Sequence, residues 1–168
     1  MHMNMTNAAA LAATEAMPKV RLVCDADIPA LVAIGRELHQ ENGVMPYSEK
    51  RVYETIMRAV NRDRMIGGVI GDAGDPEAVI FLTVGQFFYS EYPHLEELLA
   101  FVRPEYRRSN RAKALIMFAK QAAQELHVPL LIGVMSQQRT EAKARLYQRQ
   151  LGKPAGSYFI WNGRTGGN

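Results

Sequence analysis

Three arginines stand close together in the middle of the chain, where a strand pattern changes into a helix pattern. They are Arg107, Arg108 and Arg111, in the segment VRPEYRRSNRAKALIMFAK that covers 102–120. The first N–H groups of a helix have no partner inside it, and the helix dipole adds about half a positive charge there. Guanidinium groups add full charges and bind phosphate oxygens strongly. The sequence therefore predicts an anion site at 107–112 whose geometry suits a pyrophosphate.

The elements that must position this site follow from hydrophobic periodicity and from turn residues. Strands are expected at 19–24, 65–71, 77–89, 94–102, 128–135 and 156–161. Helices are expected at 28–41, from Ser48 onward, at 110–125 and at 140–150. Short connections between the three middle strands favour antiparallel hairpins, whereas a helix between two strands implies a right-handed crossover and a parallel pair. This order predicts an α/β fold with a mixed, mostly antiparallel central sheet flanked by helices on both faces.

Length and composition limit the class of protein. A chain of 168 residues suits one domain, which we expect over 18–168 after a flexible N-terminal leader at 1–17. Cys24 is the single cysteine, and no group of His and Cys stands at metal-ligand spacing, so we expect neither a disulfide scaffold nor a metal. No apolar run is long enough for a membrane span, and the N-terminus lacks the basic part of a signal peptide. We therefore expect a cytoplasmic protein without membrane contact.

The segment from Arg107 to Ala112, RRSNRA, resembles the RxxGxG/A signature of the GNAT N-acetyltransferase superfamily. Arg107 and Ala112 match this signature, while Asn110 stands where the first glycine is usual. Asparagine is the residue that best replaces glycine at positive φ, so we expect the turn to be kept with Asn110 in that conformation. In the family, the backbone amides of this loop hold the pyrophosphate of acetyl-CoA.

A second match lies at 140–152, where TEAKARLYQRQLG resembles the family's NxxAxxLYxxLGF. The matching residues are Leu146, Tyr147, Leu151 and Gly152, and the departures are Thr140, Lys143 and Lys153. A helix and one strand separate the two motifs, as they do in the family, and the order of elements over 19–161 is the family order. The resemblance therefore covers nearly the whole chain after the leader and implies the GNAT-like acyl-CoA N-acyltransferase fold.

The resemblance also implies roles for individual residues. Tyr147 would donate a proton to the departing thiolate of the coenzyme, for which a phenol with a pKa of about 10 is a reasonable donor. Glu97 would take the proton of the attacking amine, with Glu96 or a chain of water molecules as the alternatives. Only one of these two carboxylates can face the cleft unless a bulge intervenes, because successive strand residues face opposite sides. The residues expected to bind the coenzyme are Phe101, Val102, Arg107, Arg108, Ser109, Asn110, Arg111 and Ala112.

We therefore expect an N-acetyltransferase that moves an acetyl group from acetyl-CoA to a primary amine by direct attack. The alternative is a catalytically degenerate module of the same fold that binds CoA or a phosphate ligand without turnover. The acceptor is expected to be a small molecule or a protein that carries the amine, and the family resemblance also allows a homodimer. The net charge of +3 is mild and no aromatic residue stands between the three arginines, which argues against nucleic acid as a partner.

Overall fold

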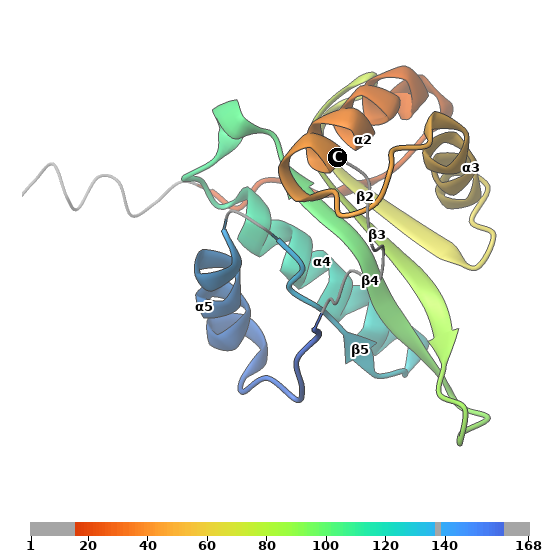
Figure 1. Cartoon of the computed structure of the whole chain (residues 1–168), viewed down its shortest axis with the longest axis vertical. Coiled ribbons are helices and arrows are strands. Elements are labelled where there is room, and N and C mark those ends of the chain that lie inside the picture. The colour runs from red at the N-terminus through yellow and green to blue at the C-terminus, as the bar shows by residue number, and fades with distance from the viewer. Residues whose placement is uncertain (1–15, 137–138, 160–168) are drawn as a thin grey trace, which may run out of the picture.

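One five-stranded sheet forms the centre of the computed structural model, which describes residues 16–136 and 139–159 (Figure 1). The strands are β1 (Arg21–Leu22), β2 (Met65–Asp72), β3 (Asp75–Gln86), β4 (Pro93–Val102) and β5 (Leu130–Leu131), in that order across the sheet. Neighbours from β1 to β4 pair antiparallel, and β4 pairs with β5 in parallel. The predicted mixed, mostly antiparallel sheet is confirmed. Most of the expected leader, 1–15, lies outside the described residues.

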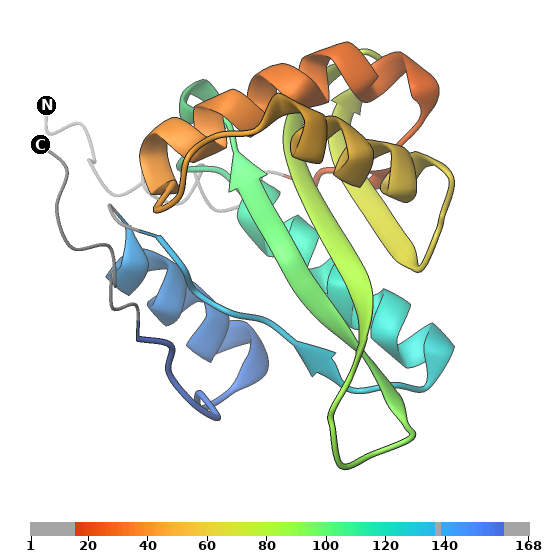
Figure 2. The same cartoon turned by 45° about the vertical axis from the view of Figure 1, so that its right-hand side comes forward.

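Helices cover both faces of this sheet, as predicted. They are α2 (Ile28–Asn42), α3 (Glu49–Val60), α4 (Arg111–Leu126) and α5 (Thr140–Leu151), with short 3₁₀ turns η1 (Asp25–Asp27) and η2 (Pro104–Tyr106). The pair α2 and α3 lies on one face and α4 on the other, and α5 lies beside α4 (Figure 1, Figure 2). Ser48 caps α3 by accepting a hydrogen bond from the N–H of Arg51. Among the helices of the described ranges, none combines the length and the apolar character needed to cross a membrane.

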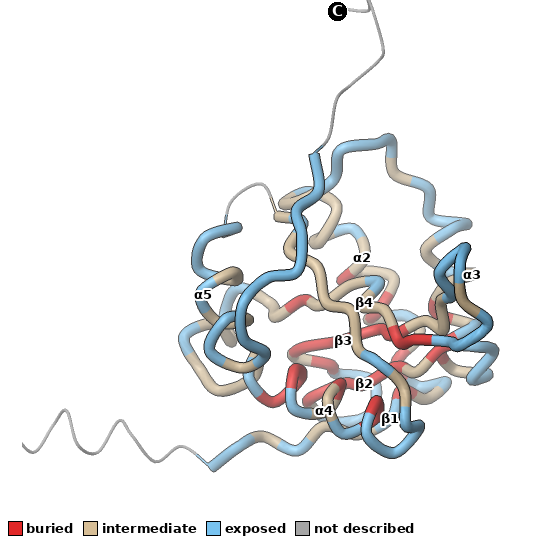
Figure 3. Tube along the Cα trace, turned by 90° about the horizontal axis from the view of Figure 1, so that it is seen from below, coloured by how far each residue is buried: buried red, intermediate tan, exposed pale blue. Residues whose placement is uncertain are grey.

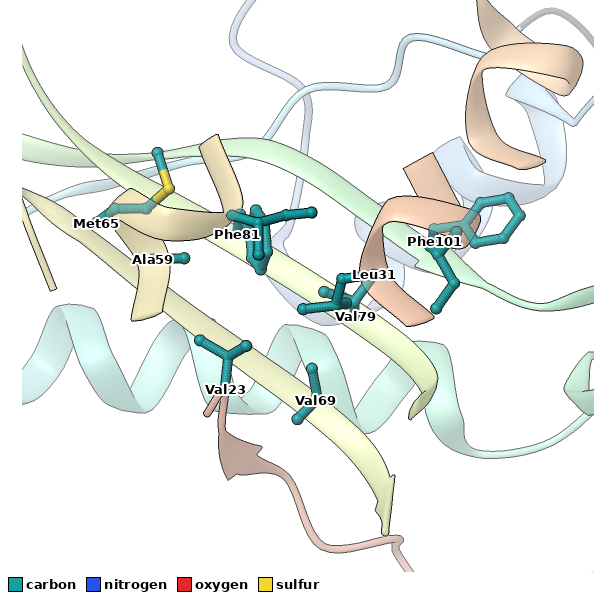
Figure 4. Packing of buried hydrophobic residues seen from close by; sticks show 10 residues of the cluster. Val23, Leu31, Ala59, Met65, Val69, Val79, Phe81 and Phe101 are labelled. Carbon is teal, nitrogen blue, oxygen red and sulfur yellow. The ribbon is translucent and has the colours of Figure 1, made fainter. Parts of the chain in front are cut away.

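Two hydrophobic layers hold the helices to the sheet, one on each face. The layer under α2 and α3 includes Ile34 from α2 and Phe81 from β3, and Figure 4 shows ten of its side chains. The layer under α4 includes Leu115 from α4 and Ile80 from β3. Strand β3 serves both layers because its successive side chains point to opposite faces. The buried part of the trace accordingly runs through β2 and β3 at the centre of the molecule (Figure 3).

Partway along strand β4, the alternation of its side chains between the two faces of the sheet is interrupted. Leu95 and Ala100 both pack into the layer under α4. They stand five positions apart, so in a regular strand their side chains would point to opposite faces. The pairing with β3 shifts by one residue between Phe81 and Leu82, so β4 carries an extra residue, Leu98. Such a bulge bends the strand and breaks the regular ladder at that point.

The sequence prediction is wrong about the lengths of the outer strands. The strand expected at 128–135 has only the two residues of β5, which pair with β4 directly before its bulge. The strand expected at 156–161 is not formed over 156–159, which are exposed and belong to no strand. Residues 160 and 161 lie outside the described part of the chain. Local strand propensity is not enough at either place, because a strand also needs an edge that supplies hydrogen bonds.

Candidate active site

A cavity of about 190 Å³ lies where the end of β4, the turn before α4 and the helix α5 meet. Tyr147 lines this cavity, and so do most of the residues expected to bind the coenzyme. Those coenzyme candidates are Phe101, Val102, Arg107, Arg108, Ser109 and Ala112. Asn110, Arg111 and Glu97 are not among the lining residues. The fold thus brings the two sequence motifs to one place, although a helix and a strand separate them in the chain.

The cavity opens because β4 and β5 separate. Their parallel pairing joins Leu95 with Leu130 and Glu96 with Leu131, and it ends there. After β5 the chain leads away from β4 toward α5 (Figure 2). The edge of β4 beyond its bulge, at 98–102, is therefore not covered by β5. Its backbone groups can be offered to a ligand that lies along the strand.

Tyr147 and Glu97 form a hydrogen-bonded pair beside the cavity. The Tyr147 hydroxyl donates to the Glu97 carboxylate, with oxygen–oxygen distances of 3.1 and 3.4 Å. Burial raises the pKa of Glu97 to about 7, although the hydrogen bond from Tyr147 and the positive charge of Lys143 both act to lower it. Burial and the neighbouring Glu97 charge raise the pKa of Tyr147 well above its ordinary value, so the phenol keeps its proton. Of these two residues, Tyr147 lines the cavity and Glu97 does not. A proton can therefore pass between the cavity and Glu97 through the phenol.

Glu96 lies in a different environment. Its side chain is about half exposed (46%) and approaches His94 Nε2 at 3.9 Å. The bulge at Leu98 comes after both carboxylates, so Glu96 and Glu97 keep the alternation of a regular strand. The structure therefore places Glu97, and not Glu96, beside Tyr147. The role of Glu97 as a base stays a prediction.

Two of the three arginines in the turn are bound to carboxylates. Arg107 forms an ion pair with Glu41 at 2.7 Å and donates from Nε to the Val102 carbonyl at 2.9 Å. Arg111 forms an ion pair with Glu77, also at 2.7 Å. Each guanidinium would have to exchange its carboxylate for a phosphate in order to bind an anionic ligand. Their assignment as coenzyme ligands stays a prediction.

Arg108 is the exposed cation of the turn, and its side chain makes no hydrogen bond or ion pair with any residue that the structure describes. Its φ of 63° is in the left-handed region, whereas Asn110 has φ −77° and stands at the N-cap of α4. The expectation of positive φ at Asn110 is therefore wrong. Ser109 fixes this turn, because its hydroxyl donates to the Tyr106 carbonyl at 2.7 Å and accepts from the N–H of Arg111 at 3.3 Å.

Glu41 and Asn42, at the end of α2, are candidate site residues that the sequence analysis missed. Glu41 holds the turn before α4 through its ion pair, and Asn42 Oδ1 accepts a hydrogen bond from Ser136 Oγ at 3.0 Å. One signal could have pointed to Glu41. Glu37 and Glu41 stand four positions apart, as do the two arginines that they bind. Matched spacing of this kind indicates two facing rows of opposite charge.

Comparison with known proteins bears on the fold. No protein-family model matches the sequence, and no curated protein matches it significantly. Solved structures match over most of their length. A predicted acetyltransferase from Clostridium acetobutylicum, solved with acetyl-CoA, is 12% identical with a TM-score of 0.69, over 87% of this chain and 96% of its own.

Two further structures are similar to the chain. A Trypanosoma brucei acetyltransferase is 15% identical with a TM-score of 0.64, over 86% of this chain and 98% of its own. An aminoglycoside acetyltransferase from an uncultured soil metagenomic sample is 12% identical with a TM-score of 0.63, over 86% of this chain and 97% of its own. The chain therefore has the fold of these acetyltransferases, which is the GNAT-like fold that its two motifs predict.

Proposed function

We propose that the chain is an acetyl-CoA-dependent N-acetyltransferase that moves an acetyl group to a primary amine by direct attack on the thioester. One observation carries this proposal: a single cavity is lined both by the arginine-containing turn before α4 and by Tyr147. The turn can hold the anionic part of a ligand, and the phenol can supply a proton to a leaving group. The similar structure from C. acetobutylicum was solved with acetyl-CoA, which supports the same ligand here.

The lining of the cavity fits the phosphates of the coenzyme. Arg108 offers an exposed positive charge, and Ala112 belongs to the first turn of α4, whose N–H groups lack partners inside the helix. Each charge-assisted hydrogen bond contributes about 1.5 to 3 kcal/mol, so three or four such bonds suffice for micromolar binding after the costs of association. In this proposal the uncovered edge of β4 at 98–102 aligns the pantetheine arm and its thioester.

The bound coenzyme supplies an activated acetyl group whose sulfur needs a proton as it leaves. Tyr147 donates its hydroxyl proton to that sulfur. Glu97, which is unprotonated above a pH of about 7, accepts the proton lost by the amine through water, since Glu97 itself does not line the cavity. It then returns a proton to Tyr147 across their 3.1 Å hydrogen bond. The two residues end in their starting protonation states, and holding the reactants together contributes most of the rate gain.

Release of free thiol from acetyl-CoA with a panel of primary amines tests this function. The panel contains simple alkylamines, an aminoglycoside and peptides with a free N-terminus or a lysine. Tyr147→Phe should lower kcat by about 100-fold, because it removes the proton donor. Binding of CoA, measured by calorimetry, should change little in this variant. Tyr53→Phe is the matched control, since Tyr53 is an exposed tyrosine of α3 outside the cavity.

Two outcomes would contradict the proposal in different ways. Binding of CoA without turnover on any amine would favour the second candidate, a module that binds the coenzyme or another phosphate ligand. The departures from the family motifs, at Asn110 in the first and at Lys143 in the second, are the observation that favours this candidate. Failure of the wild-type chain to bind CoA would exclude both the acetyltransferase and a module that binds the coenzyme.

A further inference from the structure

Lys143 places an amine inside the candidate active site. It lies one helical turn before Tyr147 on α5, and both residues line the cavity. Side chains four positions apart on a helix are neighbours, with about 5–6 Å between their Cβ atoms. Lys143 is partly buried, whereas Lys50 and Lys153 are exposed. Within the described residues, no hydrogen bond or ion pair holds its ammonium group.

The groups around Lys143 influence how readily its amine loses a proton. Burial lowers the pKa of Lys143, and the positive charge of Arg107 lowers it further. The carboxylates of Glu97 and Glu41 act in the opposite direction without cancelling the effect of burial. Only a neutral amine can attack a carbonyl carbon, so Lys143 is better prepared for attack than a lysine in water.

We infer that Lys143 is an acceptor within the chain itself and that the protein acetylates this lysine when acetyl-CoA is bound. The inference rests on the proposed function, because it needs the coenzyme in the cavity. If Tyr147 protonates the leaving sulfur, the acetyl carbon lies within a few ångströms of the phenol. The side chain of Lys143 is long and flexible and starts one turn away along the same helix, so its amine can be directed toward that position.

The reaction is balanced by the groups already present. The electron pair of the neutral Lys143 nitrogen forms a bond with the acetyl carbon, and the bond between that carbon and sulfur breaks. Tyr147 gives a proton to the departing sulfur, and Glu97 takes one from the lysine nitrogen. Transfer of that proton from Glu97 to Tyr147 restores both groups. The products are one acetyl-lysine and one free CoA, and no further reactant is needed.

Peptide mapping by mass spectrometry tests the inference on the unmodified full-length chain. The protein is incubated with acetyl-CoA without an added amine, and the acetylated fraction of each lysine is followed over time. Acetylation at Lys143 also blocks tryptic cleavage before Ala144, which gives a second readout. We expect Lys143 to be modified at least about tenfold faster than the exposed Lys50 and Lys153, because it alone is held beside the thioester. Excess CoA should slow modification at Lys143 by a similar factor and leave the exposed lysines unaffected.

The outcomes separate this inference from the proposed function. If the chain acetylates external amines while Lys143 stays unmodified, the inference is wrong and the proposed function stands. Equal rates at all three lysines, unaffected by CoA, would mean chemical acetylation from solution and would also overturn the inference. If calorimetry shows no CoA binding, both fail together. The intact mass of the Lys143→Arg variant confirms the position. After incubation with acetyl-CoA, this variant should not gain the one acetyl group that the wild type gains rapidly.

Discussion

Replacing Glu97 by glutamine should make the stability of the protein less sensitive to pH. The side chain keeps its shape and can still accept the hydrogen bond from Tyr147, but it can no longer ionise. Burial raises the pKa of Glu97 from an ordinary value of 4.5 to about 7. Between these two pH values the folded chain holds the proton while the unfolded chain releases it.

The sign and size of the effect follow from this difference. Because the folded state binds more protons, the free energy of unfolding of the wild type falls as pH rises from 4.5 to about 7, and it stays level above that. At about 1.4 kcal/mol for each pH unit, the loss amounts to about 3 kcal/mol. Glu97→Gln should avoid this loss. The free energy of unfolding of the variant minus that of the wild type should therefore be about 3 kcal/mol higher at pH 8 than at pH 4.5.

Urea unfolding followed by circular dichroism at several pH values between 4.5 and 8 measures this difference. Glu96→Gln is the matched control, because it makes the same change in a neighbouring side chain that is about half exposed. Its stability relative to the wild type should vary much less over this range. If Glu97→Gln and Glu96→Gln showed the same pH dependence, the Glu97 carboxyl would not be buried as described, and the proposed proton transfer would lose its basis.

Three further predictions address the site and its support. The value of kcat/KM for thiol release should rise with pH through about 7, since Glu97 must be unprotonated to accept a proton; a flat profile would count against it. Arg108→Gln should weaken CoA binding about tenfold in calorimetry, while Lys50→Gln should not, because Arg108 lines the cavity and Lys50 does not. Asp27→Asn should lower the free energy of unfolding in urea by about 3 kcal/mol, because it leaves the Arg21 guanidinium without its buried carboxylate at 2.8 Å; a loss below about 1 kcal/mol would contradict this.

Features that depend on residues close in the chain could be predicted from the sequence. The apolar spacing within α2 and α4 and the short turns between β2, β3 and β4 are local patterns, and the structure confirms these elements. The two motifs are local as well, so the sequence was enough to name the turn at 107–112 and Tyr147. The separation of the motifs by a helix and a strand was also readable, and with it the type of fold.

The tertiary structure alone decided which distant groups meet. The sequence marks Arg107 as a cation, but it does not show that Glu41, 66 positions away, neutralises its charge. It names both Tyr147 and Glu97, yet their hydrogen bond joins residues 50 positions apart and depends on how α5 lies against β4. The bulge at Leu98 and the two-residue length of β5 likewise depend on neighbouring strands. Ion pairs, buried carboxylates and strand edges are properties of the packed chain, because their energies depend on contacts that form only when distant segments come together.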